Sequence, residues 1–211
     1  MKRNALLHQL VTHENTFDFI VIGGGATGLG IALDAITRGA SVALFEQDDF
    51  TKGTSSRSTK LVHGGVRYLA QGDVSLVLEA LRERGLLRKN ASHLVKNQSF
   101  LSPCYRWWEG AFYTIGLILY DLMAANLGFG RSFCIGPKRA VKTIPMLRKK
   151  GMKAGVIYHD GQFDDSRLAI NIAQTAVDAG ACVLNYMKVT NLIKQEGKVC
   201  GVEVMDMETG E

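Results

Sequence analysis

The sequence predicts an α/β protein built around a parallel β-sheet, and three neighbouring features near its N-terminus carry that prediction. Residues 19–22 (FIVI) are an unbroken apolar run, which favours a strand buried on both faces. Gly23, Gly25 and Gly28 follow with G-x-G-x-x-G spacing, and residues 29–38 then have a helical pattern. A strand, a glycine turn and a helix in this order are typical of a site that binds the diphosphate of a dinucleotide.

Each residue type in the turn suits that ligand. Gly23 permits the tight turn, Gly25 lets a diphosphate approach the backbone, and Gly28 lets helix and strand pack closely. Ala26 and Thr27 lie where the helix begins, so its first N–H groups and partial positive charge would face the phosphates.

An acidic residue follows the next predicted strand. Residues 41–45 (SVALF) favour a second buried strand, which ends in Glu46 and is followed by Gln47. Glu46 comes at roughly the 20-residue spacing from the first glycine that is typical of a ribose-binding carboxylate. Such an acid accepts hydrogen bonds from ribose hydroxyls and repels a 2′-phosphate, so FAD or NAD is favoured over NADP.

The loop after Glu46 has an unusual composition, reading TSSRSTKLVHGGVRYL over residues 54–69. It would lie at the carboxyl edge of the sheet, beside the diphosphate. Hydroxyl side chains, the cations Arg57 and Lys60, and the Gly64-Gly65 pair suit a cofactor that continues past its diphosphate. The hydroxyls are those of Thr54, Ser55, Ser56, Ser58 and Thr59.

Charge and cysteine content exclude other classes of protein. The 211 residues carry a formal net charge of +5, but the basic residues are scattered and no nucleic-acid motif accompanies them. The chain has four cysteines, without a C-x-x-C motif or a histidine at zinc-ligand spacing. We therefore expect reduced, mostly buried thiols, no metal site and no nucleic-acid partner.

The N-terminal residues 1–16 predict a short packing helix. Their apolar run is too short for a signal peptide, so the expected location is the cytoplasm. Residues 17–70 and 154–211 are predicted to form the dinucleotide-binding domain, and residues 71–153 an inserted helical segment that contributes to the part facing substrate and membrane.

The inserted segment contains a clear amphipathic helix and an apolar one. Residues 74–89 form the first, with Asp73 as its N-cap. Residues 110–127 are the most apolar stretch, and we expect a buried helix. The alternative is a helix that enters a membrane face, aided by Trp107, Trp108 and Arg106.

The C-terminal part returns to the dinucleotide-binding domain. Residues 164–179 predict a helix, residues 182–186 a third parallel strand, and residues 189–193 and 199–205 two antiparallel strands that form a β-meander. A further turn at residues 208–210 should lead into another strand, which suggests part of a longer protein.

Three stretches together resemble the FAD-dependent glycerol-3-phosphate dehydrogenases: IVIGGGATGLGIALDAITRG with Glu46, TSSRSTKLVHGGVRYL, and YHDGQFDDSRL at residues 158–168. The resemblance runs from Phe17 onward and extends to glycerol-3-phosphate oxidases. It implies a Rossmann-like, glutathione-reductase-like FAD-binding fold.

The resemblance also implies the cofactor, the reaction and the residues. FAD would take hydride from glycerol 3-phosphate and pass electrons to a quinone, with peripheral attachment at the inner face of the cell membrane. The loop residues that the resemblance implies along the cofactor are Thr54, Ser55, Arg57, Ser58, Lys60, Leu61 and Val62. Val189 would meet the adenine, and the Asp164–Arg167 block is expected to be structural. The resemblance leaves the oligomeric state open, including a homo-oligomer.

Three residues would face the reacting centre, and each has a simpler alternative. His63 would lie near the flavin ring and suits the acceptance of the hydroxyl proton, because an imidazole ordinarily titrates near neutrality. Arg67 suits the phosphate or the hydroxyl, since a guanidinium binds in a bidentate way. Alternatively, His63 caps a turn or bonds the cofactor, and Tyr68 only packs.

The function also has alternatives. They are an oxidase that uses O2, a related flavin amine oxidase such as a glycine oxidase, and a cofactor-binding module without activity in this length.

Overall fold

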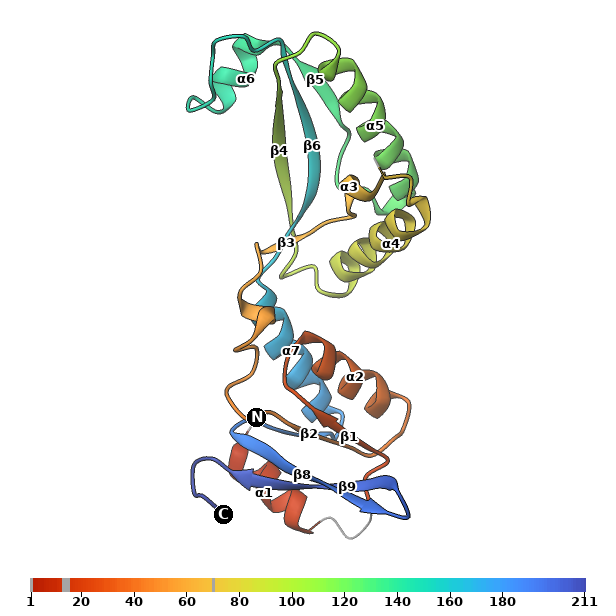
Figure 1. Cartoon of the computed structure of the whole chain (residues 1–211), viewed down its shortest axis with the longest axis vertical. Helices are drawn as coiled ribbons and strands as arrows, with labels where there is room; N and C mark the ends of the chain where they lie inside the picture. Colours follow the sequence, from red (N-terminus) through yellow and green to blue (C-terminus); the bar gives the residue numbers. More distant parts are fainter. Residues whose placement is uncertain (1, 13–15, 70) are drawn as a thin grey trace. The chain divides into compact units, whose positions relative to one another are not determined.

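The structure is a computed structural model that describes residues 2–12, 16–69 and 71–211, with the backbone alone at residue 67 (Figure 1). It divides into two compact units. Unit 1 comprises Met1–Thr59 and Asp164–Glu211, and unit 2 comprises Lys60–Phe163. The chain therefore leaves unit 1 after residue 59 and returns at residue 164, which gives a longer insertion than residues 71–153.

Unit 1 contains the predicted parallel sheet. Its strands are β1 (Phe19–Ile22), β2 (Val42–Phe45) and β7 (Cys182–Leu184), in the order β1-β2-β7. All neighbours are parallel. This confirms the predicted strand before the glycine turn, the predicted strand before Glu46, and the third strand that begins at residue 182.

Two helices cover one face of this sheet, as Figure 1 shows. They are α2 (Ala26–Thr37) and α7 (Asp165–Asp178). Their contact is built largely from alanine, with Ala32, Ala169, Ala173 and Ala176 all at 0% exposure. Small side chains let the two helices and the sheet approach closely, so the core of unit 1 lies here.

The other face of the sheet is covered by α1 (Arg3–Thr12) and an antiparallel hairpin, β8 (Met187–Gln195) and β9 (Lys198–Asp206). The hairpin confirms the predicted turn, because Glu196 and Gly197 both have positive φ, 51° and 80°. Arg3 joins α1 to the hairpin through an ion pair with Asp206 of 2.9 Å.

The expectation that β1 is buried on both faces is wrong. Phe19 and Ile22 are 51% and 57% exposed, and of this strand only Val21 is buried. The reason is position in the sheet. Among the described residues β1 pairs with β2 alone and is an edge strand, so one side of it has no neighbouring strand.

Unit 2 is not purely helical, because it contains a four-stranded antiparallel sheet. The strands are β3 (Leu61–Val62), β4 (Lys96–Cys104), β5 (Phe133–Ile135) and β6 (Ala154–Gln162). The long strands β4 and β6 pair along their whole length, and β3 and β5 both pair with β6. The helices are α3 (Val66–Leu69), α4 (Val74–Asn90), α5 (Glu109–Ala124) and α6 (Pro137–Thr143), with single 3-10 turns η1 (Thr54–Ser56, in unit 1) and η2 (Ala125–Leu127).

The predicted amphipathic helix of unit 2 is confirmed as α4. The Asp73 carboxylate caps it by accepting the N–H of Leu76 at 3.1 Å.

The expectation of a buried apolar helix at residues 110–127 is wrong for the described structure. Together α5 and η2 form a helical segment of 19 residues, which is long and apolar enough to cross a membrane. The core helix of a soluble protein can have the same length and composition. Only 22% of the most apolar window is buried. The helix packs through Gly110, Leu117, Tyr120 and Ala124, with Met123 partly buried beside them. Its remaining large apolar side chains face outward.

All four cysteines are free thiols, two buried and two exposed. Burial raises the pKa of the Cys182 thiol to about 11. Within the described part of the chain, no three His, Cys, Asp or Glu side chains are grouped so that they could hold a metal ion.

Candidate functional site

The glycine turn of unit 1 is closed by direct backbone packing. The N–H of Gly23 donates to the carbonyl of Phe45 at 2.8 Å, and Gly23 has a φ of 109° that favours glycine. A Cβ on Gly28 would lie 2.0 Å from the Gly23 carbonyl oxygen. Helix α2 therefore begins directly against the turn. Its N-cap is Gly25, which has no side chain that could occupy the helix N-terminus.

Glu46 is held at the carboxyl end of β2 by two backbone groups. Its Oε2 accepts the N–H of Gly24 at 2.7 Å, and its Oε1 accepts the N–H of Asp48 at 2.9 Å. A Cβ on Gly24 would lie 2.6 Å from the Phe50 ring. The carboxylate is thus fixed beside the turn, where it can accept further hydrogen bonds from hydroxyl groups. Gln47, next in the chain, is exposed.

The serine-rich loop that precedes β3, residues 54–60, is called the hydroxyl loop, and it bonds back to the same turn. The hydroxyl of Ser55 accepts the N–H of Ala26 at 2.9 Å, and the N–H of Thr51 donates to the carbonyl of Gly24 at 3.1 Å. Thr54 and Arg57 lie exposed on this loop, and Thr27 lies exposed at the start of α2. Unit 1 therefore brings together three features that are separate in the sequence: the glycine turn, Glu46 and the hydroxyl loop.

The Asp164–Arg167 block has the structural role expected for it. Asp164 is the N-cap of α7 and accepts the N–H of Arg167 at 3.0 Å. Asp165 is buried and accepts a hydrogen bond from the Ser58 hydroxyl. This bond anchors the end of the hydroxyl loop to the first turn of α7.

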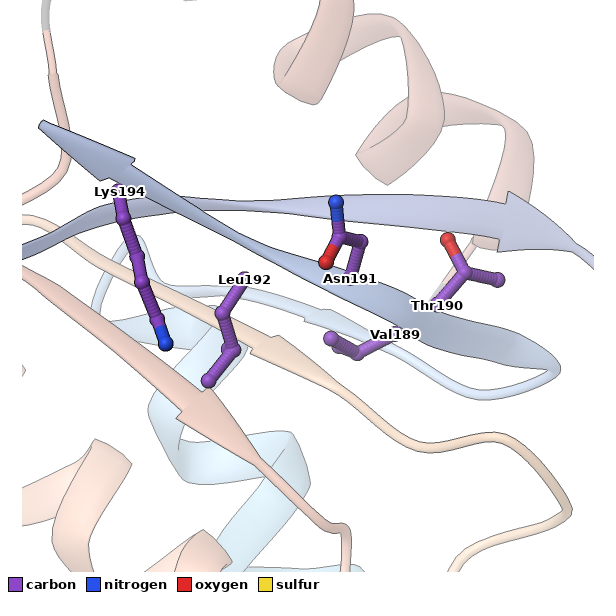
Figure 2. A pocket seen from close by; sticks show the side chains of 5 residues that line it. All are labelled: Val189, Thr190, Asn191, Leu192 and Lys194. Carbon is purple, nitrogen blue, oxygen red and sulfur yellow. The ribbon is translucent and has the colours of Figure 1, made fainter.

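Val189 lies on β8, at a β-bulge where the pairing shifts between Val189 and Asn191. It lines a surface pocket of 470 Å³ together with Thr190, Asn191, Leu192 and Lys194. Figure 2 shows Leu192 and Lys194 on the same side of the strand. The backbone contact with adenine stays a prediction.

The remaining predicted residues lie in unit 2. Lys60 has a φ of 62°, and its carbonyl accepts the N–H of Phe163 at 3.0 Å. Leu61 and Val62 form β3, with both side chains half-buried. Residues 66–69 form α3, in which Tyr68 is 44% exposed and the Arg67 side chain lies outside the described residues.

His63 is exposed, and its ring caps a backbone turn. Its Nδ1 accepts the N–H of Gly65 at 3.1 Å. The turn-capping alternative therefore describes the geometry of this residue, and a role in proton transfer stays a prediction.

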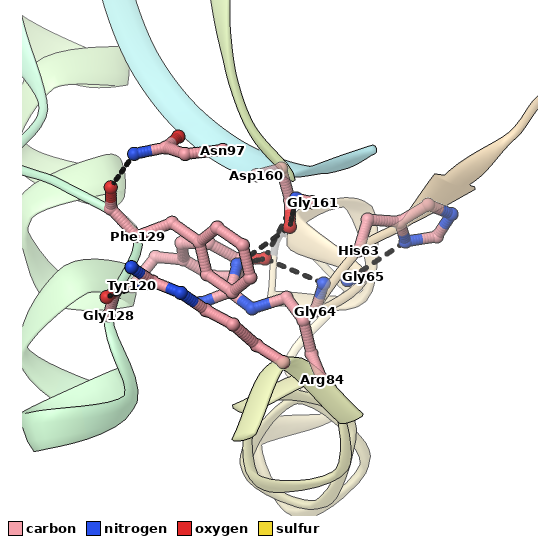
Figure 3. A network of polar contacts seen from close by, with 11 residues as sticks. His63, Gly64, Gly65, Arg84, Asn97, Tyr120, Gly128, Phe129, Asp160 and Gly161 are labelled. Carbon is pink, nitrogen blue, oxygen red and sulfur yellow. Dashed lines mark hydrogen bonds and ion pairs between the residues drawn. The ribbon is translucent and has the colours of Figure 1, made fainter. Parts of the chain in front are cut away.

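Sequence reasoning missed a buried polar network directly behind this turn (Figure 3). Arg84, Tyr120 and Asp160 are 2%, 1% and 4% exposed. The Arg84 Nη1 atom lies 2.7 Å from Asp160 Oδ1, and the Tyr120 hydroxyl lies 3.2 Å from Asp160 Oδ2. The same hydroxyl accepts the backbone N–H of Gly64 at 2.8 Å. The network thus touches the residue next to His63.

One feature of the sequence could have revealed this network. Arg84 falls on the same stripe of α4 as Val77, Leu81 and Gly85, all of which are buried. A charged residue on an apolar stripe implies a buried partner of opposite charge. Asp160 lies within the distinctive 158–168 stretch, but nothing local in the sequence pairs it with Arg84.

Comparisons with known proteins show the family to which the chain belongs. A family model for FAD-dependent oxidoreductases (DAO) matches residues 18–211. The mitochondrial glycerol-3-phosphate dehydrogenase of Saccharomyces cerevisiae is 46% identical over 221 residues, covering 100% of this chain and 34% of the yeast protein. The human protein of the same name is also 46% identical, covering 96% of this chain and 30% of its own length.

A solved structure has a similar fold. The Bacillus halodurans glycerol-3-phosphate dehydrogenase complexed with FAD superposes with a TM-score of 0.74 at 36% identity, covering 99% of this chain and 34% of that chain. The chain thus spans about a third of the length of these relatives. Because the family model covers the chain from residue 18 to its last residue, the chain belongs to the FAD-dependent oxidoreductase family and is similar to its glycerol-3-phosphate dehydrogenases.

Proposed function

We propose that this chain is the FAD-binding part of a flavoenzyme that oxidises glycerol 3-phosphate to dihydroxyacetone phosphate and passes the electrons to a quinone. The observation that carries the proposal is the close packing of Gly28 on the Gly23 carbonyl. This packing leaves no room for a side chain at residue 28, in the first turn of α2. It occurs in a chain that is 46% identical along its whole length to a glycerol-3-phosphate dehydrogenase.

The residues of unit 1 fit the adenosine diphosphate part of FAD. The helix N-terminus offers N–H donors and a partial positive charge to two phosphates, and the Glu46 carboxylate offers acceptors to the ribose hydroxyls. Gln47 lies beside it, and Val189 would meet the adenine through its backbone. The residues proposed for the diphosphate are Gly23, Gly25, Ala26, Thr27 and Gly28.

The hydroxyl loop and the strand that follows it are proposed to continue along the cofactor toward the flavin. Ser55 supports this, because its hydroxyl already bonds the first N–H of α2. The residues assigned to this part are Thr54, Ser55, Arg57, Ser58, Lys60, Leu61 and Val62.

The substrate would be held by residues that follow β3. FAD, when bound, supplies a two-electron acceptor for the hydride from C2 of the substrate. Arg67 is proposed to bind the phosphate or to orient the C2 hydroxyl, since a guanidinium forms bidentate charge-assisted bonds. Tyr68 and His63 are proposed to complete this end of the site, and both have exposed side chains.

A membrane-facing role is proposed for unit 2, at the cytoplasmic side of a membrane. The outward face of α5 and the residues before it form an apolar surface with large exposed fractions, from 51% to 86%. Aromatic residues and a neighbouring cation suit an interface between water and lipid. The surface comprises Trp107, Phe112, Ile115, Leu119 and Leu122, with Arg106 beside it.

FAD binding is expected to depend on Gly28. Gly28→Ala should weaken FAD binding about tenfold or more, because a Cβ would displace the turn and its hydrogen bonds to a charged diphosphate. Gly30→Ala is the matched control in the same helix, since no atom lies within 4 Å of the added Cβ. Flavin fluorescence measures binding, and circular dichroism verifies folding. Equal binding by both folded variants would contradict the assignment of the turn.

Turnover is expected only when this chain continues to the length of its relatives. Dye reduction should occur with glycerol 3-phosphate, and much less with glycerol, because the phosphate supplies the charged contact. The 211 residues alone should show no turnover. Reduction by glycine instead would indicate an amine oxidase, and release of hydrogen peroxide would indicate an oxidase. Turnover by the 211 residues alone would overturn the assignment of a partial active site.

Vesicle binding is expected to depend on the outward face of α5. Leu122→Glu, at a position that is 69% exposed, should weaken sedimentation with phosphatidylglycerol-containing vesicles about tenfold, because it replaces apolar contact with a charge. Val199→Glu on β9 carries the same charge change at 57% exposure and should bind as the unmodified chain does. The same loss in both variants, or in neither, would refute a membrane contact through α5.

A further inference from the structure

The buried network in unit 2 costs free energy that stability alone does not explain. Removing Arg84 and Asp160 from water is expensive, and a buried ion pair often stabilises a protein no better than well-packed apolar residues would. The guanidinium also lies over the Phe129 ring, 4.6 Å from its centroid. A role for the network is therefore to be sought in the groups that it holds in place.

The Tyr120 hydroxyl is the point at which the network reaches the backbone. It donates to Asp160 Oδ2 at 3.2 Å, because an ionised carboxylate only accepts. It accepts hydrogen bonds from Arg84 Nη1 at 3.2 Å and from the Gly64 N–H at 2.8 Å. Burial and the nearby Asp160 charge raise the pKa of Tyr120, so its proton stays in place. All three hydrogen-bonding positions of this hydroxyl are used.

Gly64 is confined sterically as well as by its hydrogen bond. An added Cβ would lie 2.4 Å from both the Tyr120 hydroxyl and a methyl carbon of Leu81. Gly65, next in the chain, has a φ of 69°, a conformation that favours glycine. The two glycines therefore form a rigid turn that is clamped between α4 and α5.

This turn determines which nitrogen of His63 carries the proton. A backbone N–H can only donate, so the 3.1 Å bond from Gly65 makes Nδ1 an acceptor. In the neutral imidazole the proton is then on Nε2. Figure 3 shows the imidazole bonded to this turn, beside the buried network.

We infer that Arg84, Tyr120 and Asp160 are positioning residues that hold the Gly64–Gly65 turn and thereby keep His63 as the Nε2–H tautomer. Neutral His63 then offers a hydrogen-bond donor at Nε2 and does not accept a proton there. The relevance to substrate rests on the proposed function: the donor would bind an oxygen of the polyol phosphate or of the cofactor, and another group would take the hydroxyl proton.

The test is a nuclear magnetic resonance measurement on the full 211-residue chain without FAD, so it does not depend on turnover or cofactor binding. Long-range ¹H–¹⁵N spectra of ¹⁵N-histidine-labelled protein at about pH 8 distinguish the two tautomers. His63→Asn identifies the His63 signals. We expect Nε2 to be protonated and Nδ1 unprotonated. A proton on Nδ1 would overturn the inference, whatever the variants show.

Tyr120→Phe removes the hydroxyl and keeps the ring. The Gly64 amide should exchange with solvent about tenfold faster, and the His63 signals should move toward a mixture of tautomers. Tyr113→Phe is the matched control, because Tyr113 is an exposed tyrosine of the same helix. It should change neither readout.

A second variant separates loss of the network's hydrogen bonds from unfolding of unit 2. Arg84→Lys keeps a cation beside Asp160 but loses the fixed planar donor set, so it should accelerate Gly64 exchange less than Tyr120→Phe. Exchange of the Val156 amide in β6 reports whether unit 2 stays folded. Folded variants at both positions with unchanged Gly64 exchange and an unchanged tautomer would overturn the clamp.

Discussion

The contact between the first turn of α2 and the carbonyl oxygen of Gly23 is the constraint on which unit 1 depends. With only 2.0 Å available for a Cβ, residue 28 must be glycine, and α2 must begin directly where β1 ends. This places the helix N-terminus at the carboxyl edge of the sheet, beside Glu46, and the Ser55 hydroxyl returns to the same N-terminus. The proposed anion site, the proposed ribose acceptor and the hydroxyl loop are therefore all placed by one close backbone approach.

A second constraint acts in unit 2, where polar groups replace glycine packing as the means of fixing a turn. The ion pair of Arg84 and Asp160 would be a poor source of stability by itself. Through Tyr120 it gives the Gly64 N–H a buried acceptor, and a buried polar group without a partner is costly. A buried polar network of this kind favours one geometry, which is what a residue such as His63 requires if it is to present one particular nitrogen.

Several elements of unit 1 were predictable because each depends on a short stretch of sequence. They are the first strand with its glycine turn and helix, Glu46, the third strand and the hairpin. Hydrophobic period and turn residues decide them locally. The exposure of β1 was not predictable in this way, because a buried and an edge strand can share the same apolar run. The network was missed for a related reason: Gly64, Arg84, Tyr120 and Asp160 meet only through tertiary packing. The outward face of α5 shows the same limit, since its composition suits both a core helix and a membrane surface.

Hydrogen–deuterium exchange of this chain with and without FAD tests the central claim most directly, because it reports where the cofactor binds residue by residue. Backbone amides that bind phosphate exchange more slowly when the ligand is present. We predict slower exchange at residues 23–28 and at residues 54–62, which comprise the hydroxyl loop and β3. We predict no change at the tip of the hairpin, residues 195–198. Saturating FAD that leaves residues 23–28 unprotected, or that protects another region instead, would contradict the assignment of the glycine turn as the cofactor site.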